Sequence, residues 1–321
     1  MTQQTDLLTL CISQTTQLTP HIRCYRLISP KGDELPLVTA GSHLEILIQV
    51  ASGKTEFRNY SICSNPAQRE CYDIAVLVDD SNDNGSNFIV ETFQVNTQLE
   101  CKMPSNNFQL HADASPAILI VDGMGVAPIK TIAQTLTLRG RRFVLHYAGS
   151  SLNEMAFAKE LKTDFARQIQ FYPEDENLHL DIMQILSDAP GNAVFYASGT
   201  KKLLDDIEIS ARMLGIAPDR IQREYFSTEK ANEDKAVVLE LAYSNKLINA
   251  SADQPLLTAL RDAGIEVNFD CCVGDCGTCA VKVLEGEAEH RDHVLSEEQK
   301  AQGFMCLCVS RAKSDRLLLA L

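Results

Sequence analysis

The first third of the chain alternates short apolar stretches with polar turns. Five stretches have the length and the apolar content of short strands: Leu7–Ser13, Ile22–Ser29, Ser42–Val50, Asn59–Cys63 and Tyr72–Val78. Clusters of turn-forming residues, such as Ser29–Gly32 and Asp79–Gly85, separate these stretches. Many short strands with such punctuation predict a small antiparallel barrel or sandwich.

The pattern changes near residue 112, where buried apolar runs begin to alternate with helical stretches. The apolar runs are Ala117–Gly123, Phe143–Ser150, Ile169–Pro173 and Ala193–Gly199, and the helical stretches are Pro128–Arg139, Met155–Lys162, Asp181–Leu186 and Lys202–Leu214. Strands that alternate with helices predict βαβ units and a parallel sheet. We therefore expect an α/β domain of the nucleotide-binding type that ends near Phe226.

A polar, charged stretch, Ser227–Lys235, predicts a linker to a third unit. In that unit we expect strands at Ala236–Ser244, Lys246–Ser251, Ala280–Glu285 and Arg316–Leu321, and helices at Pro255–Asp262 and Ser296–Ala301. The predicted boundaries are 1–108, 109–228 and 236–321, with the linker at 229–235. A chain of 321 residues fits two or three domains.

Charge narrows the classes of partner. The chain has 43 acidic and 29 basic side chains, a formal net charge of −14, which disfavours binding to nucleic acid. No run of 18 or more apolar residues occurs, so we expect no membrane span. The N-terminal stretch lacks the basic and apolar regions of a secretion signal, so a soluble cytoplasmic protein is expected.

Cysteines are concentrated near the C-terminus. Six of the eleven fall after residue 270, and none occurs between residues 102 and 270. The five early ones, Cys11, Cys24, Cys63, Cys71 and Cys101, have no ligand-like spacing and are predicted to be small buried hydrophobes. A late cluster in a chain without a secretion signal favours metal binding or redox chemistry over disulfides.

The late cluster has the spacing of a plant-type [2Fe–2S] site: Cys271-x4-Cys276-x2-Cys279, with a fourth cysteine far downstream. Gly274 and Gly277 suit a tight loop whose amides turn toward the cluster. Cys272 interrupts the rhythm and is left out as a ligand, and the spacing does not decide between Cys306 and Cys308. The alternative is a structural zinc site, but zinc ribbons favour paired C-x2-C knuckles and only one is present.

Two further motifs suit phosphate-bearing cofactors. In the strand-rich domain, Arg58 offers a guanidinium to a phosphate, and Gly85 and Ser86 offer amides at a predicted helix start. Tyr60 is suited to pack on an isoalloxazine ring, and Ser61 to hydrogen-bond to its edge.

In the α/β domain, the turn with Gly123, Gly125 and Pro128 lies between a strand and a helix, where a diphosphate binds in nucleotide-binding folds. Residues 148–153 contain no basic side chain, which favours NADH over NADPH.

Together these motifs resemble the phthalate dioxygenase reductase family over nearly the whole chain. The resemblance rests on RNYS (58–61), NGS (84–86), GMGVAP (123–128), EYF (224–226), CCVGDCGTC (271–279), HRD (290–292) and CVSRA (308–312). It implies three domains: an antiparallel β-barrel of the ferredoxin-reductase type that binds FMN, a parallel-sheet α/β domain that binds NADH, and a C-terminal β-grasp ferredoxin.

Several residue roles come from the resemblance alone. It selects Cys308 as the fourth ligand, beside Cys271, Cys276 and Cys279, and places Phe226 against the flavin. It also places Gly199 in a turn that is Cys-Gly-Pro in the family and Ser198-Gly199-Thr200 here.

Two more departures are Asp122, where the family has glycine, and Ala127, where it has threonine. A carboxylate at position 122 would repel a diphosphate unless its side chain points away. His290 is expected to fix its loop by donating a hydrogen bond rather than to bind metal.

The expected activity is electron transfer from NADH through FMN and the [2Fe–2S] cluster to a Rieske-type terminal oxygenase. No side-chain nucleophile is required, so no catalytic residue is proposed beyond the flavin contacts Ser61 and Phe226. The C-terminal residues 231–321 carry 15 acidic and 9 basic side chains, which fits docking to a basic patch. The alternatives are another acceptor, such as a cytochrome or a diiron hydroxylase, a non-catalytic redox module with a decayed nicotinamide site, and a zinc-bound scaffold.

Overall fold

A computed structural model describes residues 7–49, 55–78, 92–225, 235–244, 246–252, 254–269, 274, 277–292 and 294–321. The chain forms two compact units, Met1–Ser227 and Thr228–Leu321, which are described separately below. In the described part of the chain, every helix is too short or too polar to cross a membrane.

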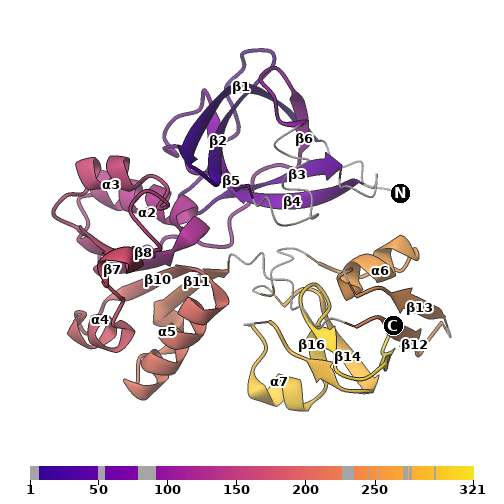
Figure 1. Ribbon diagram of the computed structural model, residues 1–321. Coiled ribbons are helices and arrows are strands. Elements are labelled where there is room, and N and C mark those ends of the chain that lie inside the picture. Colours follow the sequence, from indigo (N-terminus) through magenta and orange to yellow (C-terminus); the bar gives the residue numbers. More distant parts are fainter. Residues whose placement is uncertain are drawn as a thin grey trace. The chain divides into compact units, whose positions relative to one another are not determined.

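The first unit begins with an antiparallel barrel (Figure 1). Among the described residues its strands follow the order β4-β3-β6-β1-β2-β5. Their bounds are β1 (Leu8–Thr19), β2 (Ile22–Ile28), β3 (His43–Gln49), β4 (Thr55–Ser61), β5 (Tyr72–Leu77) and β6 (Gln98–Cys101). A bridge between Ile62 and Ile74 joins the two outer strands and closes the barrel.

Alternation along the strands fills the barrel interior. Leu44, Ile46 and Ile48 of β3 are all at most 3% exposed, whereas the residues between them are partly exposed, as a two-residue period requires. Of the early cysteines, Cys63 and Cys101 are buried as predicted. The prediction is wrong for Cys11, Cys24 and Cys71, which are partly exposed. Cys11 and Cys24 lie within β1 and β2 at positions that alternate with buried residues, so their side chains face away from the barrel interior.

The α/β domain follows, with a parallel sheet in the order β11-β10-β7-β8-β9. Its strands are β7 (Ala117–Asp122), β8 (Phe143–Gly149), β9 (Ile169–Pro173), β10 (Val194–Gly199) and β11 (Ile221–Tyr225). Its helices are α2 (Val126–Leu138), α3 (Ala158–Asp164), α4 (Ile182–Asp188) and α5 (Lys201–Met213), with single 3-10 turns η1 (Gly123–Gly125), η2 (Glu174–Glu176) and η3 (Pro218–Arg220).

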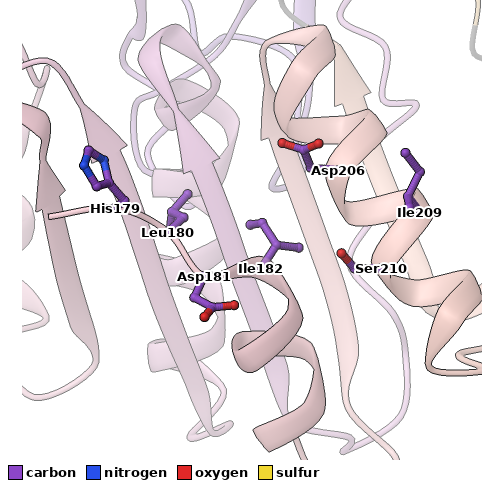
Figure 2. A pocket seen from close by; sticks show the side chains of 7 residues that line it. All are labelled: His179, Leu180, Asp181, Ile182, Asp206, Ile209 and Ser210. Carbon is purple, nitrogen blue, oxygen red and sulfur yellow. The ribbon is translucent and has the colours of Figure 1, made fainter.

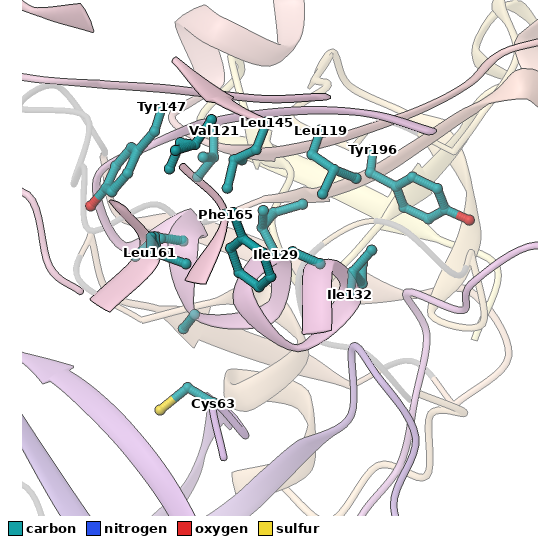
Figure 3. Packing of buried hydrophobic residues seen from close by; sticks show 14 of the residues in the cluster. Cys63, Leu119, Val121, Ile129, Ile132, Leu145, Tyr147, Leu161, Phe165 and Tyr196 are labelled. Atoms are coloured by element: carbon teal, nitrogen blue, oxygen red, sulfur yellow. The ribbon is translucent and has the colours of Figure 1, made fainter. Parts of the chain in front are cut away.

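Each face of this sheet is covered by a different pair of helices. On one face, Leu119 and Val121 of β7 pack with Leu145 and residues of α2 and α3 (Figure 3). On the other face, Ile118 and Ile120 pack with residues of α4 and α5. The chain changes faces after β9, so the strand order reverses between β7 and β10. That reversal makes the carboxyl ends of these two strands the point at which such sheets bind ligands.

A buried lysine joins the barrel to the α/β domain within the first unit. Lys130 of α2 is only 6% exposed, and its Nζ atom donates to the Cys63 carbonyl at 3.0 Å. The same ammonium lies 2.9 Å from Glu160 Oε1 and 4.7 Å from the centre of the Phe157 ring. The charge is therefore solvated by a carbonyl, a carboxylate and an aromatic face instead of water.

The second unit is a mixed sheet in the order β13-β12-β18-β14-β16. Its strands are β12 (Val237–Leu241), β13 (Leu247–Ala250), β14 (Ala280–Glu285), β16 (Phe304–Cys306) and β18 (Arg316–Leu319), and β15 (Ala288–Glu289) pairs with β17 (Arg311–Ala312). The first strand β12 runs parallel to the last strand β18, and helix α6 (Leu256–Asp262) packs on the sheet, as in a β-grasp; α7 (Glu297–Ala301) follows β15.

The predicted fold class is confirmed, and most predicted elements occur within a few residues of their expected bounds. The exceptions have local causes. β4 begins at Thr55 rather than Asn59. The mainly polar segment Thr55–Asn59 gave no strand signal in the sequence, but it pairs with the neighbouring strand β3. Five strands were not predicted. β6, β15, β16 and β17 have four residues or fewer, and Ile221–Tyr225 of β11 carries three polar residues. The predicted linker at 229–235 lies almost wholly outside the described residues.

Replacing Lys130 with methionine should destabilise the first unit. The substitution keeps the chain length but removes the charged donor from the Cys63 carbonyl, a loss of about 2 kcal/mol and roughly 5 °C in melting temperature. Thermal unfolding of the flavin-loaded protein measures the effect. The matched control is Lys159→Met, because Lys159 is an exposed lysine on neighbouring α3; equal melting temperatures for the two variants would contradict the assigned role.

Candidate cofactor sites

Buried thiols gather at the start of β14 in the second unit. The Sγ atoms of Cys279 and Cys308 lie 3.2 Å apart, and Cys306 ends β16 directly opposite Ala280. Hydrogen bonds from Cys306 and from Cys308 lower the pKa of the Cys279 thiol. A thiol held as thiolate in a buried place is the form that binds metal. Cys271, Cys272 and Cys276 lie outside the described residues.

The donor set fits an iron–sulfur group. Two thiolates on one tetrahedral ion would be about 3.8 Å apart for bonds of about 2.3 Å, which is close to the separation of Cys279 and Cys308. Cys306 is fully buried and Cys308 is 7% exposed. Both lie near Cys279, so the choice of Cys308 as fourth ligand stays a prediction.

Asp292 ties the cysteine loop to the strand that follows Cys308. Its carboxylate is almost fully buried and accepts hydrogen bonds from Leu295 N and Ser310 Oγ, each at 3.1 Å. A Cβ on Gly274, where φ is +85°, would lie 3.1 Å from the Asp292 Cα atom. The loop, the HRD motif and the CVSRA segment are therefore held together by close packing that requires glycine.

The role expected for His290 stays a prediction. Its Nδ1 atom is buried without a hydrogen bond in that part of the structure, 3.6 Å from Asp292 Oδ1. The Asp292 carboxylate accepts from two donors at once, from Leu295 N and from Ser310 Oγ.

Three residues of the predicted flavin motif lie on β4. Arg58 and Tyr60 are two positions apart, so they share one side of the strand, and both are partly buried. Ser61 is 5% exposed and pairs with His43 of β3. The guanidinium suits a flavin phosphate, and the phenol ring and the hydroxyl on the same strand suit the isoalloxazine ring. Gly85, Ser86 and Phe226 lie outside the described residues.

The glycine turn lies at the point where the strand order of the parallel sheet reverses. Gly123 has φ of +50° and open space at its Cβ position, whereas a Cβ on Gly125 would lie 2.1 Å from the Ser198 carbonyl oxygen. Gly125 therefore lets the start of α2 approach the end of β10. Pro128 is the third residue of α2, where its missing N–H leaves no intrahelical bond unmade.

The first turn of α2 has no side-chain cap from the described residues. Its amide groups are therefore suited to an anion. The structure places Gly123, Gly125, Pro128 and Gly199 at the carboxyl edge of β7 and β10.

The Asp122 carboxylate points across this edge to Thr200. Its Oδ1 atom accepts from Thr200 N at 2.7 Å, and its Oδ2 atom from Thr200 Oγ1 at 2.6 Å. Burial raises the pKa of Asp122, against the lowering effect of these two bonds. The sequence shows that Asp122 and Thr200 both depart from the family pattern, but it does not show that they are hydrogen-bond partners. Only the pairing of β7 with β10 brings the two residues together.

A separate pocket of about 460 Å³ lies between the amino end of α4 and one side of α5 (Figure 2). His179, Asp181, Ile182, Asp206, Ile209 and Ser210 line it, together with Leu180. None of the predicted site residues that the structure describes lines this pocket, so it lies apart from the three candidate sites.

Comparisons with known proteins agree with this arrangement. Residues 9–110 match the oxidoreductase FAD-binding domain family, and residues 231–313 match the 2Fe-2S iron-sulfur cluster binding domain family. The chain is 31% identical to the carnitine monooxygenase reductase subunit of Escherichia coli (strain K12) over 97% of each chain. It is 34% identical to the heme-dependent oxidative N-demethylase beta subunit of Ectopseudomonas mendocina (strain ymp) over 98% of this chain and 99% of the other.

Among solved structures, phthalate dioxygenase reductase has a TM-score of 0.81 and 28% identity over 98% of both chains. That protein is described as a modular structure for electron transfer from pyridine nucleotides to [2Fe-2S].

Replacing Asp292 with alanine should weaken retention of the iron–sulfur cluster. The change leaves Leu295 N and Ser310 Oγ without their acceptor beside the ligand loop, so iron loss to a chelator should become about tenfold faster. The decay of the visible absorbance, with iron and acid-labile sulfide analyses, measures it. Asp315→Ala is the control, since Asp315 is exposed in the same unit; equal rates for both variants would count against a supporting role.

Replacing Gly125 with alanine should displace α2 from β10. The added methyl group meets a backbone carbonyl rather than a flexible side chain, so we expect a loss of about 2 kcal/mol in unfolding free energy together with weaker NAD⁺ binding. Thermal unfolding and calorimetric titration measure the two effects. The control Gly191→Ala adds a methyl group where nothing lies within 4 Å, and should leave both quantities unchanged.

Proposed function

Because this chain belongs to the phthalate dioxygenase reductase family, we propose that it passes electrons from NADH through FMN and a [2Fe–2S] cluster to a Rieske-type terminal oxygenase. That it is an electron-transfer oxidoreductase with flavin, nucleotide-binding and 2Fe–2S domains follows from the full-length similarity. The choice of FMN, of NADH and of a Rieske-type acceptor is the proposal.

The observation that carries the proposal is the buried thiol pair, Cys279 and Cys308, inside the segment that matches the 2Fe–2S family. Two domains precede that segment in the chain. The barrel has Arg58 and Tyr60 on one strand, and the parallel sheet has a glycine turn where its strand order reverses. When bound, a flavin accepts two electrons as hydride and releases them singly, and a cluster takes one at a time.

The chain's own residues bind and position these groups. Arg58 offers a fixed charge to the flavin phosphate, and Tyr60 beside it offers a ring face. The uncapped first turn of α2 offers amides to the diphosphate of the nucleotide. Cys279 and Cys308, whose Sγ atoms lie 3.2 Å apart, are proposed to hold one iron, and Cys271 and Cys276 the other.

FMN is proposed over FAD because the resemblance covers the phosphate-binding residues Arg58, Gly85 and Ser86. NADH is proposed over NADPH because residues 148–153, which include the end of β8, contain no basic side chain for a 2′-phosphate. Phe226 is proposed as an aromatic contact of the flavin.

A second candidate acceptor has specific support. One relative, 34% identical over almost its full length, is the beta subunit of a heme-dependent oxidative N-demethylase. The alternative is therefore a reductase whose final acceptor is a heme protein. The acidic C-terminal residues would suit a basic docking patch on either partner.

Anaerobic NADH should bleach the flavin and then the cluster absorbance of the purified protein. Released flavin should be identified by mass spectrometry as FMN, and NADPH should act more weakly than NADH by about tenfold or more. If NADH bleaches neither absorbance, the protein is not the proposed NADH-dependent enzyme. If the released flavin is FAD, the proposal of FMN is wrong. A colourless protein with bound zinc would support a zinc-bound scaffold.

The acceptor is identified by reconstitution. The reduced protein should transfer electrons to a purified Rieske oxygenase faster than to a heme N-demethylase, in parallel stopped-flow measurements. Faster reduction of the heme protein would favour the second candidate and contradict the first.

A further inference from the structure

The carboxyl edge between β7 and β10 contains two helix amino ends. Helix α2 starts after β7, and helix α5 starts after β10, and each has 13 residues. Each end carries about half a positive charge from its unpaired amides. With the strand order reversed between β7 and β10, both helices start at the edge of the sheet where such folds bind nucleotides. Figure 1 shows the two helices beside the parallel sheet.

Only one of the two ends is left for a ligand. Thr200 is the N-cap of α5, and its Oγ1 atom accepts from Leu203 N at 3.3 Å. Because Oγ1 accepts there, it donates its own proton to Asp122 Oδ2, while Thr200 N donates to Oδ1. Both carboxylate oxygens therefore accept, which is the pattern of the ionised form.

The side chain of Asp122 is directed to α5 by the two-residue period of β7. Ile118 and Ile120 face α4 and α5, so Asp122 faces the same way. A Cβ on Gly199 would lie 1.8 Å from Asp122 Oδ1, so glycine is needed for the carboxylate to reach Thr200. The interaction is thus built from three residues on two neighbouring strand ends.

We propose that Asp122 sets a low affinity for the pyridine dinucleotide by holding a fixed negative charge on the amino end of α5. The inference rests on the proposed function of this edge of the sheet. One full charge outweighs the half charge of α5 and opposes that of α2. The diphosphate would bind next to Gly123, the neighbour of Asp122 in the chain, within the roughly 8 Å over which physiological salt leaves charges unscreened. Weak retention lets the oxidised nucleotide leave after it has delivered its electrons.

Asp122→Asn tests the charge while it keeps the shape. An asparagine can still accept from Thr200 N and can donate to Thr200 Oγ1. In the oxidised holoprotein, the dissociation constant of NAD⁺ from calorimetric titration should fall about fivefold. That of nicotinamide riboside, which lacks phosphate, should not change. Added salt should weaken NAD⁺ binding more in the variant than in the natural chain, because only the variant has lost the repulsion that salt screens.

Two further variants separate charge from other causes. Thr200→Val keeps the carboxylate and the bond from the backbone N–H at position 200, but loses the two hydrogen bonds of Oγ1, to Asp122 Oδ2 and from Leu203 N, so NAD⁺ should not bind more tightly. Asp113→Asn removes a carboxylate near the opposite end of β7, where it accepts from Ser115 N, and should also have no effect. Thermal unfolding and flavin content check that each variant is folded.

The proposal is overturned if Asp122→Asn leaves NAD⁺ affinity unchanged or weakens it, since Asp122 would then be structural or would accept a hydrogen bond from the ligand. It is also overturned if Thr200→Val tightens binding equally, or if riboside affinity rises as much as that of NAD⁺. Calorimetry with NAD⁺ requires no electron transfer, so its result is independent of flavin bleaching by NADH, which tests the proposed function.

Discussion

The candidate nucleotide site of the α/β domain depends on one constraint, the reversal of strand order between β7 and β10. The connections on the two sides of this point run over opposite faces of the sheet, so α2 and α5 leave their strands in different directions. Each of these two strand ends is followed by a helix amino end, and this edge is where such sheets bind nucleotides. The close approach of Gly125 to Ser198 and the hydrogen bonds of Asp122 to Thr200 both join these two strand ends.

In the second unit, strand pairing likewise fixes the backbone positions of the side chains at the candidate site. A redox centre needs ligands whose positions do not change between its oxidation states. The thiols of Cys279 and Cys308 are buried at the start of β14 and just after β16, strands that pair with one another. Asp292 adds hydrogen bonds to Leu295 N and Ser310 Oγ, so sheet pairing and a buried carboxylate determine the positions of these two thiols.

The flavin and nucleotide domains belong to the first unit, and the 2Fe–2S domain forms the second. Hydride transfer requires the nucleotide and the flavin to meet. Within the first unit the barrel and the α/β domain are joined by the buried Lys130 and by a bond from Gly41 N to Thr131 Oγ1 at 3.1 Å. The single-electron carrier belongs to a unit of its own, with its own hydrophobic core.

The sequence by itself determined the class of each domain, because the period of apolar residues distinguishes strands of a barrel from buried parallel strands and helices. It also determined the cysteine spacing and the glycine turn, since both are local patterns along the chain. It could not predict β11 or assign a partner to Asp122. Those depend on which strand ends lie side by side: Thr200 is 78 residues from Asp122 along the chain and in hydrogen-bond contact in the fold. Only tertiary structure decides such pairs, because strand order is set by packing over the whole sheet and not by any local segment.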